Sequence, residues 1–120
     1  MPQNIIRLSF FVFCCLFSQQ VALLEHETEM GRHNSIVQVD SDTYALAYSD
    51  ENEKGWIATF TISSNGSSIT EISSLKHNNN QGLYNSLVQV DSDTYLLAYT
   101  GPGNDGFISS FTISSDGTSI

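Results

Sequence analysis

The chain has 120 residues, and its 13 Asp and Glu face only four Lys and Arg, which gives a formal net charge of −9 at pH 7. Nucleic acids are therefore excluded as expected partners, because polyanion binding depends on clustered basic side chains and the four here are scattered. The acidity is typical of a surface that keeps a protein dissolved in an extracellular or periplasmic setting, with cation binding as the alternative.

Residues 1–20 have the pattern of a secretory signal peptide, with Arg7 as the positive charge and an almost wholly apolar stretch at residues 8–17. A permanent anchor is the alternative, but a bilayer span needs about 20 apolar residues. Cys14 and Cys15 lack the small preceding residues of a lipoprotein site. Both cysteines would leave with the peptide, so we expect a secreted or cell-surface chain without disulfides or a membrane span.

Residues 35–69 and 86–120 are one sequence written twice at an offset of 51, with 22 of 35 aligned positions identical. A period near 50 residues is typical of repeat architectures, in which each unit buries its apolar surface against the next. We therefore divide the chain after the signal peptide into the tail of a preceding repeat at residues 21–34, a first repeat at 35–85 and an incomplete second repeat at 86–120.

The apolar pattern within each repeat has a period of two, as in Tyr44, Leu46 and Tyr48 on one side with Ala45 and Ala47 on the other. This period predicts β-strands, and the Val, Ile, Thr, Tyr and Phe that fill them favour the same structure. Strands are predicted at residues 35–39, 43–49, 55–63, 68–75, 86–90, 94–100 and 106–114.

The connections between these strands are short and polar. Residues 40–42 are predicted to form a tight turn, and residues 50–54 a longer loop. The dipeptides Asn65-Gly66 and Asp116-Gly117 tolerate positive φ and predict two-residue hairpin loops. The sequence therefore predicts an all-β fold in which each repeat is a four-stranded antiparallel sheet.

A four-stranded antiparallel unit of this length resembles a blade of the tandem β-propeller repeats of secreted and surface proteins. The small residues Ala45, Ala47, Ala58 and Ala98 fit that resemblance, because neighbouring blades bury both faces of each blade. The resemblance extends from about Val21 to Ile120. The marker residues of WD40, kelch and sialidase-type blades are absent from the sequence, so no family's binding residues are carried over.

Two blades do not close a ring, which takes about four to eight. One interpretation is that the chain is a segment of a longer array, since such high identity is typical of a recent expansion. The other is that copies of the chain assemble, with residues 21–26 as a strand that closes the last blade. The chain is also similar to small two-blade lectins that assemble into a ring, although their sugar sites use Arg, which is rare here.

Paired carboxylates stand in the first turn of each repeat, Asp40 with Asp42 and Asp91 with Asp93. Alternating oxygen ligands in a turn are able to hold calcium. Asp side chains that bond their own turn backbone are the alternative, and the spacing lacks the further ligands of an EF-hand. We therefore predict no cofactor, with calcium at these four residues as the candidate exception.

The loop at residues 49–54 differs from its counterpart at residues 100–105, while the strands around both are retained. Loops on a rigid scaffold often carry ligand contacts, and an aromatic residue follows each of these two. An unconstrained surface loop is the alternative. The candidate ligand-binding residues are Trp56, Phe107, Asp50, Asn104 and Asp105.

Catalytic patterns are missing from the sequence, which has no Gly-x-Ser-x-Gly elbow and no zinc-type histidine spacing. His26 and His77 share a repeat position and are predicted to be structural, at the end of an outer strand. We predict a non-enzymatic binding or interaction scaffold for a protein or glycan ligand, completed by further repeats or by homo-oligomerisation. The alternative is part of a larger propeller enzyme whose active-site residues lie outside this chain.

Overall fold

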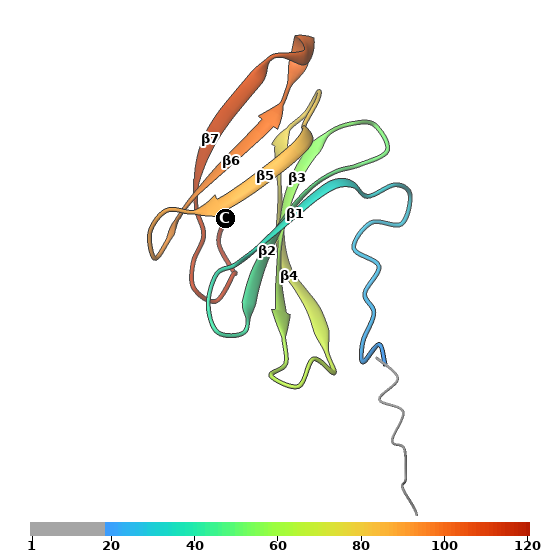
Figure 1. Cartoon of the computed structure of the whole chain (residues 1–120), viewed down its shortest axis with the longest axis vertical. Coiled ribbons are helices and arrows are strands. Elements are labelled where there is room, and N and C mark those ends of the chain that lie inside the picture. Colours follow the sequence, from blue (N-terminus) through green and yellow to red (C-terminus); the bar gives the residue numbers. More distant parts are fainter. Residues whose placement is uncertain (1–18) are drawn as a thin grey trace, which may run out of the picture.

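The computed structural model describes residues 19–120, and the predicted signal peptide lies almost wholly outside the described residues. Within this range the regular structure is β, apart from one 3₁₀ turn at Pro102–Asn104, and it forms two antiparallel sheets (Figure 1). The all-β fold class is confirmed. The first sheet has the order β1 (Arg32–Gln38), β2 (Thr43–Ser49), β3 (Gly55–Ile62), β4 (Ile69–Asn78), and the second has the order β5 (Leu83–Gln89), β6 (Thr94–Thr100), β7 (Gly106–Thr112).

All seven predicted strands are present, but β1 and β5 begin three residues earlier than the period-two pattern predicts. Each has a β-bulge at its start, where the register shifts between Arg32 and Ser35 in β1 and at the corresponding place in β5. His33 and Tyr84 adopt φ of 54° and 52° in these bulges. A bulge inserts an unpaired residue and breaks the alternation, which hides the beginning of the strand from a periodicity argument.

Gly66 and Gly117 have φ of 73° and 74°, as the turn chemistry predicts, but the two-residue loops are wrong. The backbone N–H of Ser63 donates to the carbonyl of Ser68 at 3.1 Å, so four residues lie between the paired positions. The Asn65 side chain accepts the N–H of Ser67 at 3.0 Å and stabilises this wider loop. Residues 114–119 repeat the arrangement.

The two sheets pack face to face, with β5 against β1 and β2 (Figure 1). We call the side of the first sheet that carries Val37, Ala47 and Ile57 its front face and the opposite side, with Leu46, Tyr48 and Phe60, its back face. In the second sheet, the positions 51 residues later define the front and back faces in the same way. The front face of the first sheet covers the back face of the second, and together they form the main core.

The main core is built from aliphatic and aromatic side chains of both sheets, and it explains the small residues of β2. Ala45 and Ala47 are completely buried, as expected for a sheet covered by a neighbour. Ala98 is exposed instead, because nothing in the described chain covers the front face of the second sheet. The core residues are Val39, Ala45, Ala47, Ile57, Leu87, Tyr95, Leu97, Tyr99 and Ile113.

Residues 19–31 precede the first strand and carry no strand themselves. His26 lies edge-on against Tyr48 on the back face of the first sheet, with ring centroids 4.7 Å apart. The predicted closing strand at residues 21–26 is thus an irregular segment in the single chain, and its role in closure stays a prediction.

Between residues 19 and 120, no helix has the length and apolar character needed to cross a membrane.

Candidate binding surfaces

Asp50 and Trp56, two of the predicted ligand-binding residues, contact each other directly. The indole Nε1–H of Trp56 donates to Asp50 Oδ2 at 2.9 Å, and the backbone N–H groups of Asn52 and Lys54 donate to Asp50 Oδ1 at 2.9 and 3.0 Å. Burial acts to raise the pKa of Asp50, but these hydrogen bonds outweigh it and lower the pKa below its ordinary value. Lys76 Nζ lies 4.6 Å from the centroid of the Trp56 ring, a cation–π contact.

The counterpart of this cluster in the second repeat has a different chemistry. Phe107 replaces Trp56 and stacks on Tyr99 with ring centroids 5.5 Å apart. Gly101 replaces Asp50, and a Cβ at that position would lie 2.6 Å from the Phe107 ring. A phenyl ring has no N–H to satisfy, so the position of the carboxylate is taken by a glycine that makes room for the ring.

Asn104 and Asp105, also predicted as ligand-binding, lie in the exposed loop between β6 and β7. Asn104 adopts φ of 61°, and its side chain accepts a hydrogen bond from Gln81 Nε2 at 3.3 Å. The carbonyl of Asp105 accepts the N–H of Gly101 at 2.9 Å, which closes the loop. Gln81 lies in the segment between β4 and β5, so this hydrogen bond connects the β6–β7 loop to the segment that joins the two sheets.

The four Asp residues of the predicted calcium positions bond their own turns. Asp40 Oδ1 accepts the N–H of Ser41 at 2.7 Å, and Asp42 Oδ1 accepts the hydroxyl of Thr43 at 3.1 Å. Asp91 and Asp93 repeat both distances. Across residues 19–120, no three His, Cys, Asp or Glu side chains gather as a metal-ion cluster would. Calcium at these turns stays the untested alternative to the turn interpretation.

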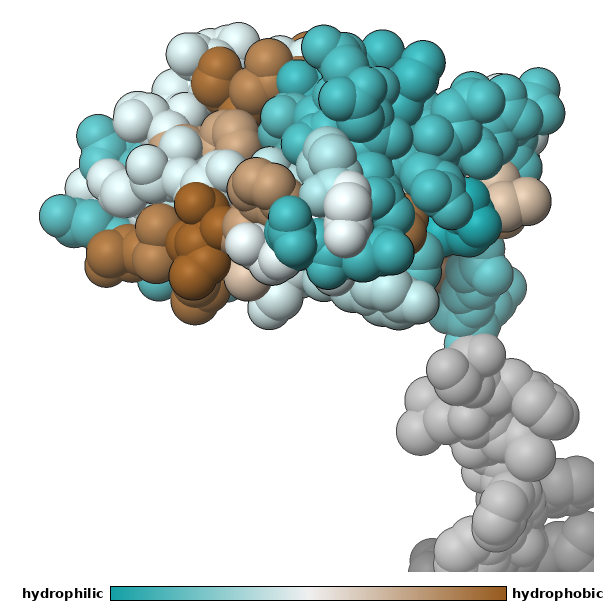
Figure 2. Space-filling model, turned by 90° about the horizontal axis from the view of Figure 1, so that it is seen from above, coloured by the Kyte–Doolittle hydropathy of each residue, from teal (hydrophilic) through white to brown (hydrophobic). Residues whose placement is uncertain are grey.

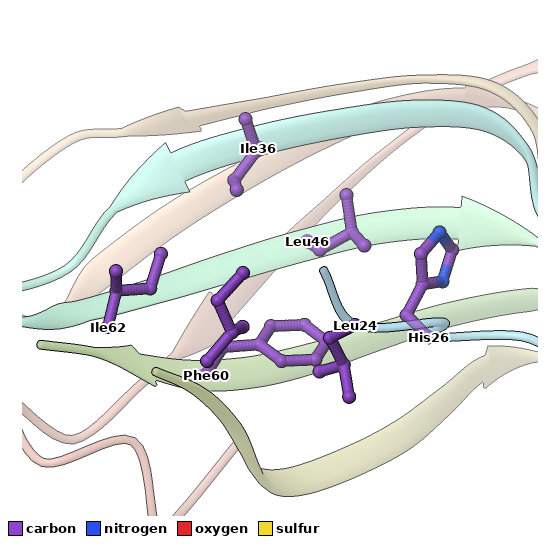
Figure 3. A pocket seen from close by; sticks show the side chains of 7 residues that line it. Leu24, His26, Ile36, Leu46, Phe60 and Ile62 are labelled. Carbon is purple, nitrogen blue, oxygen red and sulfur yellow. The ribbon is translucent and has the colours of Figure 1, made fainter. Parts of the chain in front are cut away.

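An apolar hollow opens on the back face of the first sheet. Figure 3 shows side chains from β1, β2 and β3 and from the segment before β1 around it. Its volume is about 140 Å³, well below the roughly 300–1,000 Å³ of small-molecule sites. The size fits a few inserted aliphatic side chains better than a ligand of drug size. The lining residues are Leu24, His26, Ile36, Leu46, Phe60, Ile62 and Ile69.

A shallow depression lies on the front face of the second sheet, beside Gly106, Phe107 and Ile108. Large hydrophobic side chains here are strongly exposed, including Val88, Val90 and Ile108. Hydrophobic side chains also gather on the outside of the molecule in Figure 2, as a brown patch at the left of the view. Contiguous exposed apolar side chains of this kind are typical of interaction surfaces.

Polar contacts between the two sheets come from residues that the sequence did not single out as functional. Asn85 Nδ2 donates to the carbonyl of His33 across the interface at 3.2 Å, and to the carbonyl of Gly82, three residues before it, at 3.0 Å. Thr59 Oγ1 donates to the carbonyl of Gly117 at 2.6 Å, and the Leu87 N–H donates to Ser35 Oγ at 3.0 Å. The one sequence signal for Asn85 is its identity with Asn34 at the same repeat position.

His77 lies between the sheets, near the end of the outer strand β4, where the sequence predicts a structural histidine. Its ring meets Tyr99 edge-on with centroids 4.8 Å apart, and among residues 19–120 no group has hydrogen-bond geometry to either ring nitrogen. Burial lowers the pKa of His77 from 6.5 to about 4, so the ring is neutral at pH 7.

Comparison with protein-family models, curated proteins and solved structures gives no match to this chain. The residues and their geometry therefore carry the functional interpretation. They offer two open apolar faces and an aromatic cluster beside a variable loop.

Proposed function

We propose that this protein is a secreted β-propeller-type repeat segment that acts as a binding and interaction scaffold without catalysis of its own. One observation carries the proposal: an apolar face remains open on each outer side of the sheet pair. Ile108 on one side is 75% exposed and Ile36 on the other is 61% exposed. Such surfaces cost solubility unless they serve an interaction.

Antiparallel sheets that stack front to back support the propeller-blade part of the proposal. The first sheet has four strands, and its main core lies between its front face and the back face of the next sheet. Radial repetition of such sheets is the principle of a β-propeller.

The proposal is tested by sedimentation velocity from about 1 to about 100 µM, combined with a glycan array. We expect association that strengthens with concentration, or an array signal, and loss of either in Ile36→Asp or Ile108→Asp. Ser115→Asp, which adds the same charge to an exposed loop, is the matched control. A chain that stays monomeric and gives no array signal would contradict the proposal.

A lectin-like, homo-oligomeric carbohydrate-binding propeller is the second candidate, and the Trp56 cluster favours it. An indole ring beside a carboxylate and an ammonium group offers both a stacking surface and polar contacts for a sugar. On a glycan array, Trp56→Ala should abolish a signal of this kind. A signal that survives the substitution would exclude the cluster as the sugar site.

A further inference from the structure

The two open faces of the chain are counterparts of the two faces that form its core. Ile57, on the front face of the first sheet, is completely buried, while its counterpart Ile108 is 75% exposed. Val39 and its counterpart Val90 are 8% and 58% exposed. On the back faces the order is reversed, because Leu87 is 7% exposed and its counterpart Ile36 is 61% exposed. The apolar chemistry of the internal interface is therefore present a second time, with its two halves on opposite sides of one molecule.

The hydrogen-bonding groups of the internal interface are also present twice. On the front face of the first sheet these groups are the hydroxyls of Ser35, Ser49 and Thr59. They bond Leu87 and Gly117, and Gly82 immediately before β5. Hydroxyls are retained at all three counterpart positions, Ser86, Thr100 and Ser110. These residues line the front face of the second sheet, where the described chain supplies no opposite sheet.

Asn85, in β5, supplies the reciprocal contact, from the second sheet to the first. Its amide bonds the carbonyl of His33 and the hydroxyl of Ser49. Its counterpart Asn34 is exposed and bonds only the carbonyl of Gly31, at 3.4 Å. The amide of Asn34 is thus placed to take the carbonyl of Tyr84 and the hydroxyl of Thr100 from another molecule.

Gly106 faces open space in the described chain, at the position where its counterpart Gly55 faces the other sheet. At its counterpart Gly55, an added Cβ would collide with His77 and lie 3.0 Å from Gly82, because the two sheets meet there. At Gly106 nothing lies within 4 Å of an added Cβ. The residues that correspond to His77 and Gly82 are His26 and Gly31, at the opposite end of the same chain.

His26 already has the position that this arrangement requires. It meets Tyr48 at 4.7 Å and 69°, and His77 meets Tyr99 at 4.8 Å and 68°. The segment before β1 therefore packs on the first sheet through His26 in the same way as the end of β4 packs on the second sheet through His77. His77 also has the first sheet beside it, whereas no further sheet of the described chain lies beside His26.

The edge of β7 is the last open position. In the first sheet β3 pairs with β4, but β7 pairs only with β6 in the described chain. Residues 21–27, which follow the predicted signal peptide, correspond in the repeat register to seven of the ten residues of β4. In a second molecule, these residues would complete the four-stranded sheet, since an unpaired strand edge accepts a further strand.

We propose that a second copy of this chain stacks head to tail on the first, with the front face of its second sheet on the back face of the first sheet of its neighbour. Within one chain, Ile57 belongs to the same core as Leu87 and Leu97. In the stack, Ile108 of one molecule would meet the counterparts of these two leucines, Ile36 and Leu46 of its neighbour. Residues 21–27 of the neighbour pair with the edge of β7, and Leu24 leaves the hollow as they do so. This rests on the proposed scaffold function and names its partner.

The contact joins two different surfaces, so it is heterologous, and repetition gives a closed ring or an open stack. A ring of about four to eight sheets would contain two to four copies.

Two single-face variants of the secreted chain, purified after removal of the predicted signal peptide, test the proposal. Ile108→Asp blocks the front face of the second sheet, and Ile36→Asp blocks the back face of the first. Both side chains are exposed in the single chain, so we expect both variants to fold, as circular dichroism would show. By sedimentation velocity each variant alone should be monomeric where the wild-type chain associates. An equimolar mixture should form a 1:1 dimer and nothing larger, because only one compatible pair of faces remains.

Gly106→Ala is an independent probe of the same contact. The added methyl group meets nothing in the single chain, so thermal stability of the monomer should be unchanged, while association should weaken at least about tenfold.

The outcomes separate this inference from the broader function. A wild-type chain that is monomeric at all concentrations overturns the inference, and a glycan-array signal from it would still support the scaffold function. If either single-face variant still dimerises by itself, like faces associate, and the head-to-tail contact is wrong while a scaffold role remains. A mixture that stays monomeric, or a Gly106→Ala chain that associates like the wild type, also overturns it.

Discussion

The Asp50 carboxylate accepts a hydrogen bond from the indole Nε1–H of Trp56 at 2.9 Å. The second repeat replaces both partners together, with Gly101 for Asp50 and Phe107 for Trp56. Because the acceptor disappears together with the donor, the two positions behave as one unit. The difference between the loops therefore has a structural cause, in addition to any ligand they bind.

Asp50→Ala should lower the free energy of unfolding by about 0.5–1.5 kcal/mol, because it removes the acceptor of three hydrogen bonds at a site where water takes its place in part. The double variant Asp50→Gly with Trp56→Phe, which copies the second repeat, should recover part of that loss. Urea denaturation of Asp50→Gly, of Trp56→Phe and of the double variant gives the coupling energy between the two positions. Asp105→Ala, in the exposed loop of the other repeat, should change stability by no more than about 0.5 kcal/mol. Strict additivity of the two single changes would contradict the pairing.

Asn85→Asp should cost roughly 2–4 kcal/mol although the side chains have the same shape. The substitution replaces a buried NH₂ that faces two carbonyls with a carboxylate oxygen that repels them. Asn34→Asp, at the equivalent but exposed position, is the matched control and should be nearly neutral in the monomer. Thermal melts at a concentration where the chain is monomeric compare the two. Equal losses would mean that Asn85 has no special role between the sheets.

Gly55→Ala should destabilise the fold by about 1–3 kcal/mol, since the new methyl group collides with His77 and lies 3.0 Å from Gly82. Gly106→Ala at the counterpart position should leave the free energy of unfolding of the monomer unchanged or slightly higher. Chemical denaturation of both variants measures the difference. If the two variants are equally stable, the two sheets do not approach each other closely at Gly55.

His77 should make stability fall between pH 6.5 and about pH 4. Burial lowers its pKa to about 4, while the unfolded chain keeps the ordinary value of 6.5, so the unfolded state binds more protons in this window. The contribution of His77 to stability is therefore complete above pH 6.5, declines as the pH falls, and is fully lost below about pH 4. Asp50 acts at lower pH, because its pKa lies below 3.8.

Urea denaturation at a series of pH values measures this slope. His77→Gln cannot titrate, so it should flatten the decline between pH 6.5 and 4. A variant with the same slope as the wild type would assign the decline to other groups.

Calcium should leave the melting temperature unchanged. The carboxylates of Asp40 and Asp42 already accept hydrogen bonds inside their turn, which supports the turn interpretation over the metal interpretation. Melts in a chelator and in calcium at about 1 mM compare the two, since a ligand that binds only the native state raises its stability by mass action. A rise that disappears in Asp40→Asn with Asp91→Asn would establish a calcium site instead.

The strands were predictable because their signal is local. Alternation of apolar residues sets which side of a strand is buried, and residues such as Tyr44, Leu46 and Tyr48 need no partner to show it. Positive φ at Gly66 and Gly117 was predictable for the same reason, as glycine favours that conformation wherever it stands. The bulges at His33 and Tyr84 were not, because a bulge depends on the neighbouring strand as well as on its own residues.

The sequence by itself determined the all-β class, the seven strands and the identity of the two repeats, all of which follow from local periodicity and self-similarity. Only the tertiary structure decided which side of each sheet is covered. Ile57 and Ile108 occupy the same repeat position, yet one is buried and the other exposed. The physical reason is that burial depends on what lies opposite a side chain, and a second sheet lies opposite Ile57 but none in the described chain lies opposite Ile108.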